Sequence, residues 1–136
     1  EETLPSFEKS QQWAGKSGNI ADIYNSGARK VSITVHYRVR STCSYISSSR
    51  PAYLHIALYS EKNASGSYEL WRNTDVITTS SNSYQSVTKS AEITLKSSNI
   101  FVSAWHDDHD GNHYCYNYWT DIWVEITYPD MANLYL

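Results

Sequence analysis

The chain has 136 residues, a net charge of −3 at pH 7 and only 18% charged residues. This length predicts one domain, 1–136, large enough to bury a core, with residues 1–18 as an N-terminal arm and 130–136 as a tail. The sequence has no basic block and no apolar run near 18 residues, which argues against nucleic-acid binding and against a membrane span. Because it begins with Glu1, we expect a processed mature form or an excised domain.

Short runs of alternating apolar and polar residues predict β-strands along the chain. Residues 19–24 form the first run, and residues 30–40 form the clearest one. Further strands are expected at residues 52–60, 67–72, 84–95, 100–104 and 122–126, with residues 73–83 irregular. No segment shows sustained helical periodicity. About eight short strands predict an all-β fold, most simply an antiparallel β-sandwich that is jelly-roll-like.

The stretch from Trp105 to Trp119 is the candidate site, because it gathers polar and aromatic residues between two apolar strands. Its fifteen positions hold three histidines, three aspartates, two asparagines, one cysteine and five aromatic residues. Within it, Asp110-Gly111 is a strong signal for a two-residue hairpin. In that hairpin the side chains of His106, Asp108 and His113 would share one face, as in a two-histidine, one-carboxylate metal site.

The hairpin register conflicts with the flanking strands. It would place Ile122 and Val124 on the opposite side of the sheet from Ile100 and Val102, and a one-residue slip inverts every side chain. The burial pattern should therefore decide, and we expect an extended loop that an ion or a disulfide holds in place.

Three interpretations of the ion remain open. Calcium prefers oxygen ligands, which the loop offers in Asp107, Asp108 and Asn117, with Asp110 and Asn112 nearby. Zinc would use His106, His109 and His113. The third interpretation is a polar turn without any ion.

The aromatic residues of the stretch favour a saccharide site. Rings cover the apolar face of a sugar while polar side chains take its hydroxyl groups. We expect stacking from Trp105, Tyr116 and Trp119, and hydrogen bonds from His106, His109 and His113. The alternative is that these rings only seal the end of the sandwich.

Two cysteines, Cys43 and Cys115, are separated by 72 positions. In an oxidising compartment we expect them to pair, which fits a secreted or extracellular protein. The loop-entropy model gives such a disulfide about 4 kcal/mol of stabilisation. Two free thiols in a cytosolic protein are the alternative.

Two short motifs carry a family resemblance. The segment Asp22-Ile23-Tyr24-Asn25-Ser26-Gly27 with the strand after it, and Trp105-His106-Asp107 with Asn117 and residues 122–126, resemble the PA-I-type galactophilic lectins. The wider galactose-binding-like β-sandwich group is a broader comparison. The resemblance implies a small jelly-roll-like sandwich that binds a galactoside through calcium, with the Tyr24 carbonyl, Asp107 and Asn117 as ligands.

Together these observations predict a secreted lectin or carbohydrate-binding module whose partners are glycans and whose cofactor is calcium. An enzyme is not expected, since no nucleophile elbow, zinc-protease motif or distant carboxylate partner is recognisable. An extracellular adhesive module that binds protein through its tyrosine-rich surface is the alternative. A homo-oligomer is compatible with the sequence.

Overall fold

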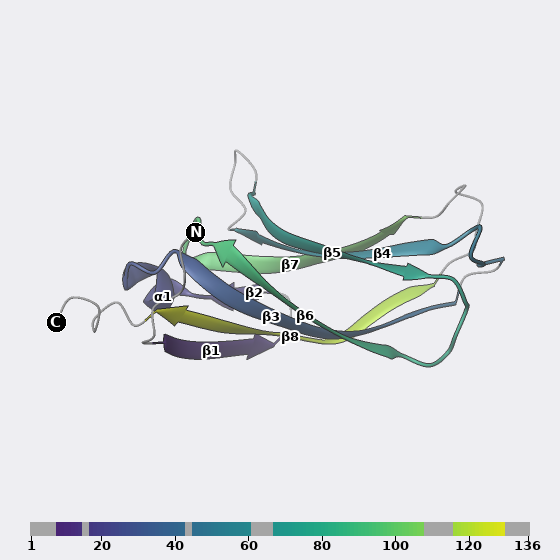
Figure 1. Cartoon of the computed structure of the whole chain (residues 1–136), viewed down its shortest axis with the longest axis horizontal. Coiled ribbons are helices and arrows are strands. Elements are labelled where there is room, and N and C mark those ends of the chain that lie inside the picture. Colours follow the sequence, from purple (N-terminus) through teal and green to yellow (C-terminus); the bar gives the residue numbers. More distant parts are fainter. Residues whose placement is uncertain (1–7, 15–16, 43–44, 61–66, 108–115, 130–136) are drawn as a thin grey trace.

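The computed structural model describes residues 8–14, 17–42, 45–60, 67–107 and 116–129. The elements in these ranges are β1 (Glu8–Ala14), β2 (Ser17–Asn19), α1 (Ala21–Asn25), β3 (Lys30–Ser41), β4 (Ala52–Ser60), β5 (Glu69–Ile77), β6 (Gln85–Thr94), β7 (Asn99–Asp107) and β8 (Asn117–Pro129). They build two antiparallel sheets, ordered β1-β8-β3-β6 and β2-β7-β4-β5. Figure 1 shows the two sheets as two layers. The predicted all-β, antiparallel architecture is confirmed, and the two layers are compatible with a sandwich.

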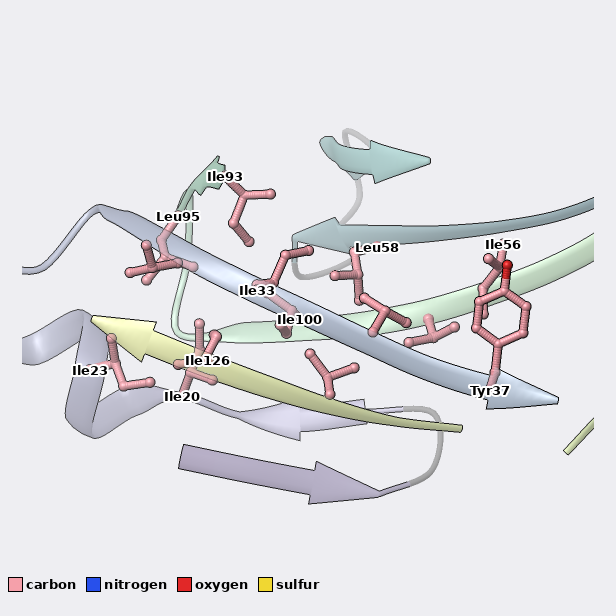
Figure 2. Packing of buried hydrophobic residues seen from close by; sticks show 14 of the residues in the cluster. Ile20, Ile23, Ile33, Tyr37, Ile56, Leu58, Ile93, Leu95, Ile100 and Ile126 are labelled. Atoms are coloured by element: carbon pink, nitrogen blue, oxygen red, sulfur yellow. The ribbon is translucent and has the colours of Figure 1, made fainter. Parts of the chain in front are cut away.

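The core lies between the sheets and follows the predicted alternation. On β3 every second side chain points inward, and Val31, Ile33 and Val35 are at most 1% exposed. They meet the inward residues of β4, including Leu54 and Leu58, which are fully buried. Figure 2 labels two of them, Ile33 and Leu58, between the strands of the two layers. Each such burial contributes about 1.5–3 kcal/mol, so the core holds the outer faces in fixed positions.

One polar cluster is built into this interior. The hydroxyl of Tyr37, which is 2% exposed, donates a hydrogen bond to the Asp75 carboxylate. It accepts a second one from Asn73 Nδ2 at 2.7 Å. Burial, and then the hydrogen bond to Asp75, raise the pKa of Tyr37 well above its usual value of about 10. The cluster ties β3 of one sheet to β5 of the other.

This cluster explains why residues 73–77 are wrongly predicted to be irregular, whereas residues 78–83 have no helix or strand, as predicted. Strand β5 continues to Ile77, and its inward positions include the polar residues Asn73 and Asp75. A search for apolar residues at alternate positions misses a strand whose interior face is polar. The partner that makes those positions acceptable, Tyr37, is 38 residues from Asp75 in sequence.

One prediction near the N-terminus is also wrong. Residues 19–24 do not form one strand: β2 ends at Asn19, and α1 follows. Ile20 and Ile23 are both fully buried, at the spacing of one helical turn, which is too short a run to show periodicity. Within the expected N-terminal arm, residues 8–14 form β1, which pairs with β8 along seven positions.

The connection between β7 and β8 crosses from one sheet to the other. β7 pairs with β4, whereas β8 pairs with β3 and β1, so the two strands flanking Asp110-Gly111 are not hairpin partners. Rejecting the hairpin was therefore right. The expected loop from 105 to 119 is too long, however, since residues 105–107 belong to β7 and residues 117–119 belong to β8.

Candidate functional site

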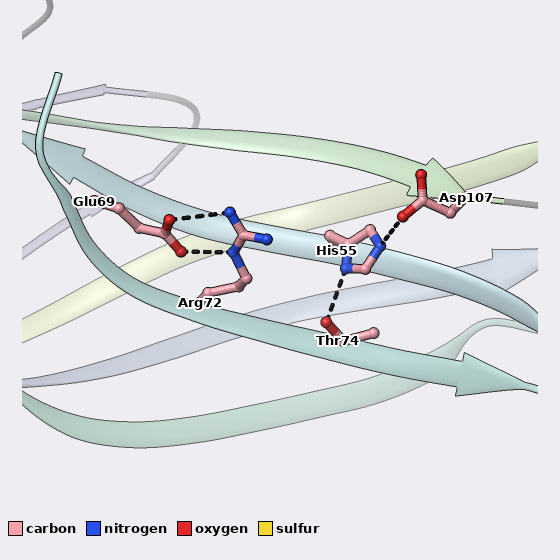
Figure 3. A network of polar contacts seen from close by, with 5 residues as sticks. All are labelled: His55, Glu69, Arg72, Thr74 and Asp107. Atoms are coloured by element: carbon pink, nitrogen blue, oxygen red, sulfur yellow. Dashed lines mark hydrogen bonds and ion pairs between the residues drawn. The ribbon is translucent and has the colours of Figure 1, made fainter. Parts of the chain in front are cut away.

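A histidine-centred cluster lies on the outer face of the β2-β7-β4-β5 sheet (Figure 3). His55 Nε2 lies 2.7 Å from Asp107 Oδ2, and His55 Nδ1 lies 2.8 Å from Thr74 Oγ1. A carboxylate can only accept, so Nε2 carries the proton and, in the neutral ring, Nδ1 accepts from the Thr74 hydroxyl. The imidazole also stacks on Trp105, with ring centroids 5.1 Å apart. Three neighbouring strands thus converge on one histidine.

An arginine extends this cluster along the same face. Arg72 binds both carboxylate oxygens of Glu69, with Nε at 2.6 Å and Nη2 at 3.0 Å, and Figure 3 shows the paired bonds. These hydrogen bonds raise the pKa of Arg72. Its guanidinium also lies 4.8 Å from the ring centroid of Trp105. The Nε–Nη2 edge of this arginine therefore already binds a carboxylate of the same chain.

The outer face of the other sheet carries an equivalent cluster. His36 stacks on Trp123 with ring centroids 3.8 Å apart and an interplanar angle of 5°. Its Nε2 lies 2.7 Å from Glu125 Oε2, and its Nδ1 lies 3.2 Å from Thr88 Oγ1. In both sheets the tryptophan and the threonine stand directly opposite the histidine, and the acid follows the tryptophan by two positions.

In each of these two clusters, side chains from three adjacent strands contact one another and stabilise the sheet. In each one both ring nitrogens are engaged by strand neighbours, and an indole covers one face of the imidazole. Cross-strand pairs of this kind each contribute about 0.2–1 kcal/mol. A histidine held in this way joins three neighbouring strands, and both of its ring nitrogens have a partner within the chain.

A cleft lies at the end of the molecule where β3 and β5 finish and β6 begins. It encloses about 270 Å³, near the lower end of the sizes usual for small-molecule sites, which begin at roughly 300 Å³. Eight of its eleven lining residues carry a polar or charged side chain, and five of the eleven come from the segment that joins β5 to β6. The lining includes Ser41, Thr78, Thr79, Ser81, Ser83 and Gln85, with Arg40 and the ring of Tyr84.

Aromatic rings surround the arginine of this cleft. The guanidinium carbon of Arg40 lies 4.2 Å from the ring centroid of Tyr118 and 5.0 Å from that of Tyr84. Arg38 lies 5.1 Å from the same Tyr84 ring, but its guanidinium pairs with Asp121 at 3.3 Å. Arg40 Nη1 donates to the Asn82 carbonyl at 3.2 Å. The cleft therefore has a cation at its wall, held by two tyrosines.

Two exposed tyrosines, Tyr45 and Tyr116, lie at the same end of the molecule as the cleft. Tyr116 is 63% exposed and Tyr45 is 80% exposed. Tyr45 borders a second hollow that shares Thr78 and Thr79 with the cleft. Tyr45 also has a positive φ of 61°, a backbone region that non-glycine residues rarely occupy and that is often found at functional positions. Cleft and hollow adjoin at Thr78 and Thr79, and the two together are called the groove below.

The predicted calcium ligand set does not assemble. Tyr24 lies in α1, beside the start of β7, where its hydroxyl contacts the Lys96 carbonyl. Asp107 is the last residue of β7, eight positions beyond Asn99, so it is about 26 Å away along the strand at roughly 3.3 Å per residue. The Tyr24 carbonyl instead accepts a hydrogen bond from Arg29 Nη1 at 2.7 Å. Tyr24 is therefore wrongly assigned as a ligand of an ion held by Asp107 and Asn117.

Asp107 and Asn117 do lie at the same end of the molecule, at the tip of β7 and the start of β8 (Figure 1). Asp107 already binds His55. Asp108 lies outside the described residues, and the described residues contain no group of three potential metal ligands among histidine, cysteine and acidic side chains. Calcium bound through Asp107, Asp108 and Asn117 stays a prediction.

The predicted stacking residues separate into different surfaces. Trp105 lies on the outer sheet face, next to His55, and Tyr116 is exposed at the end of the sandwich. Trp119 instead turns inward and packs against the core, so its assignment to a sugar-stacking surface is wrong. His106 is exposed at the tip of β7, while His109 and His113 lie outside the described residues.

A bulge in β8 explains the orientation of Trp119. His36 pairs with Trp123 and Arg38 pairs with Thr120, so one extra residue is inserted there, and Asp121 has a φ of 54°. An extra residue inverts the facing of every position before it. Trp119 therefore points into the core opposite Val39.

Comparisons with known proteins give little further information. No family model matches the chain, and no curated protein matches it. Among solved structures, the chain is similar to part of the infectious bursal disease virus VP2 subviral particle, with 8% identity and a TM-score of 0.47. The match covers 93% of this chain and 31% of that one, so the chain spans about a third of that protein's length. At this level the likeness carries no argument about function.

The described residues contain no helix long and apolar enough to cross a membrane. Both cysteines lie outside the described residues, but their neighbours meet: Thr42 N donates to the Tyr116 carbonyl at 2.9 Å. The chain segments that lead to Cys43 and away from Cys115 are thus side by side.

Sequence reasoning missed the cleft residues. The sequence pattern places Arg40 only at the end of the strand predicted over residues 30–40, and Tyr84 only at the start of the strand predicted over residues 84–95. The available signal was the serine- and threonine-rich run at 78–83 beside a tyrosine, which is rich in hydrogen-bonding side chains. Its proximity to Arg40 depends on β3 pairing with β6, which no local pattern shows.

Proposed function

We propose that this protein is an extracellular carbohydrate-binding module or lectin, with a binding rather than a catalytic role, and that its site is the groove at the Arg40 end of the sandwich. The observation that carries this proposal is the lining of the cleft. Serine and threonine hydroxyls and the Gln85 amide are gathered there beside the ring of Tyr84. Sugars need both kinds of contact, since their hydroxyl groups form hydrogen bonds and their C–H faces stack on rings.

The site differs from the one expected from the sequence in its position along the chain. Tyr116 is an exposed ring at the same end, since its carbonyl accepts a hydrogen bond from Thr42 N, and Tyr118 contacts Arg40 of the cleft. Trp105 lies on the outer sheet face with His55 and Arg72. We therefore assign Trp105 a supporting role and place sugar contacts on the groove.

We further propose that the sandwich is a jelly roll with eight strands. The strand orders support this, because each sheet places the first or second strand beside the eighth or seventh, and the third or fourth beside the sixth or fifth. A chain wrapped in this way brings its connections together at the two ends of the sandwich. One such end carries the groove.

Blocking the cleft tests the proposal. Ser83→Trp places a large ring in the lining, two residues before β6 begins, and Thr94→Trp places the same ring at the far end of β6. On a glycan array, we expect the wild type and Thr94→Trp to bind the same glycans and Ser83→Trp to lose them. Trp105→Ala should retain binding.

Three results would count against the proposal. Absence of any glycan binding by the wild type would remove the lectin function. Equal binding by Ser83→Trp would remove the cleft as its site, and loss of binding in Trp105→Ala alone would move the site to the outer sheet face. Binding to a protein array with no glycan bound would favour an adhesive module.

A further inference from the structure

We propose that the groove selects acidic saccharides, and that Arg40 recognises their carboxylate or sulfate group. This inference rests on the proposed function and specifies its ligand. It comes from one side chain whose hydrogen-bonding capacity is incompletely used. The other arginines on the outer faces with described partners show how the chain satisfies such a group.

Arg72 provides the comparison. Its Nε and Nη2 together grip the two oxygens of Glu69 at 2.6 and 3.0 Å. This is the two-point geometry in which a guanidinium matches a carboxylate. Arg38 likewise pairs with an acid, Asp121. Both arginines are therefore neutralised within the chain.

Arg40 differs at the same atoms. Its Nη1 is directed to the Asn82 carbonyl, but its Nε is buried and has no hydrogen-bond partner. Buried polar groups in folded proteins are nearly always paired, so an unpaired one calls for an explanation. Among the described residues, no acid takes the position on Arg40 that Glu69 takes on Arg72. Because Nε of Arg40 is itself buried, a ligand would reach this guanidinium through its Nη groups.

The position of the Arg40 guanidinium is restrained by two aromatic rings. The rings of Tyr118 and Tyr84 lie against the guanidinium, with centroids 4.2 and 5.0 Å from its central carbon. Contacts between a cation and an aromatic face favour the charged group and limit its rotation. A guanidinium fixed in this way can bind an anion without a large loss of side-chain freedom.

The charge of the lining agrees with an anionic ligand. None of the residues that line the cleft is acidic, and Arg40 is the one charged residue among them. The chain as a whole carries a net charge of −3, so attraction of an anion must arise locally at this arginine. The serine and threonine hydroxyls beside it distinguish a saccharide from a simple anion, because they can hold the sugar ring's own hydroxyl groups.

Two ligands of matched shape test this. Oligogalacturonate carries a carboxylate on each sugar, and its methyl ester is the same saccharide without the charge. By isothermal titration calorimetry, we expect the wild type to bind the acid at least tenfold more tightly than the ester. Dextran sulfate and uncharged dextran form a second pair, which decides whether carboxylate or sulfate is the preferred anion.

Variants of the arginine identify the contact. Arg40→Gln should bind the acid and the ester equally, while Arg40→Lys, which keeps the charge but not the two-point edge, should retain a smaller preference. Arg72→Gln is the matched control on the outer face and should keep the full preference. If Arg40→Gln does not fold, the comparison of Arg40→Lys with Arg72→Lys carries the test, and circular dichroism establishes the fold of each variant.

The outcomes separate this inference from the proposed function. Equal affinity for charged and uncharged partners in both pairs overturns the acidic preference and leaves a neutral-sugar lectin. A preference that survives in Arg40→Gln shows that another cation recognises the anion, and it too overturns the inference. If no saccharide of either kind binds, the proposed function fails first.

Discussion

Replacing Tyr37 with phenylalanine tests the polar cluster that joins the two sheets. The change removes only the hydroxyl oxygen, which donates to the Asp75 carboxylate and accepts from Asn73. A hydrogen bond to a charged group contributes roughly 1.5–3 kcal/mol, and a neutral one about 1 kcal/mol. We therefore expect Tyr37→Phe to lower the free energy of unfolding by about 2–4 kcal/mol.

That loss is large for a single domain, whose total stability is about 5–15 kcal/mol. For a chain of this size it corresponds to a fall in Tm of about 10 °C. Urea unfolding followed by tryptophan fluorescence measures it, with an unchanged denaturant slope as the sign that both unfolded states are alike. Tyr45→Phe is the matched control, since Tyr45 is 80% exposed and should change stability by less than about 0.5 kcal/mol.

The same cluster predicts a dependence on alkaline pH. Burial and the hydrogen bond to Asp75 raise the pKa of Tyr37 in the folded state above its unfolded value of about 10. Below pH 10 the phenol is protonated in both states, and this contribution to stability is fully present. Above pH 10 the unfolded chain loses the proton while the folded chain keeps it, so stability falls as pH rises.

The stability gap between wild type and Tyr37→Phe should therefore narrow between pH 10 and pH 11. The narrowing can reach about 1.4 kcal/mol per pH unit, because one proton is involved. Two results would refute the reasoning: a Tyr37→Phe variant as stable as wild type at pH 7, or a gap that does not change with alkaline pH.

Two further predictions concern the end of the sandwich near residue 107. Calcium bound through Asp107, Asp108 and Asn117 predicts that a chelator lowers Tm, that added calcium restores it, and that Asp107→Asn abolishes the response; an unchanged Tm in differential scanning calorimetry would remove calcium. A disulfide between Cys43 and Cys115 predicts a mass increase of two hydrogens on reduction and a stability loss of about 4 kcal/mol, measured by mass spectrometry and urea unfolding. Two thiols that react with iodoacetamide before reduction would show that the disulfide is absent.

How far the sequence could predict the fold depends on where each strand's partners lie. On β3 and β4, alternate apolar residues all point into one core, so strand and facing follow from local order. β5 breaks the pattern because its inward Asn73 and Asp75 are balanced by a distant tyrosine. β1 carries no alternation, and its pairing partner, β8, is at the other end of the chain.

The candidate site shows the same division. Tyr116 could be selected from the local sequence, because it lies in a stretch rich in polar and aromatic residues. The structure shows that its ring is exposed. Trp119 could not be placed, since one inserted residue at Asp121 reverses the facing of the positions before it. Its indole therefore packs against the core, although its neighbour Tyr118 contacts Arg40.

The sequence by itself determined the all-β class, the alternation of the central strands and the failure of the Asp110-Gly111 hairpin, because each rests on the period-two geometry of a single strand. Only the tertiary structure decided that Tyr24 is far from Asp107 and that Arg40 meets Tyr84 and Tyr118. Those placements depend on which strands pair and which face each residue presents, and such pairing is fixed by contacts between residues far apart in the chain.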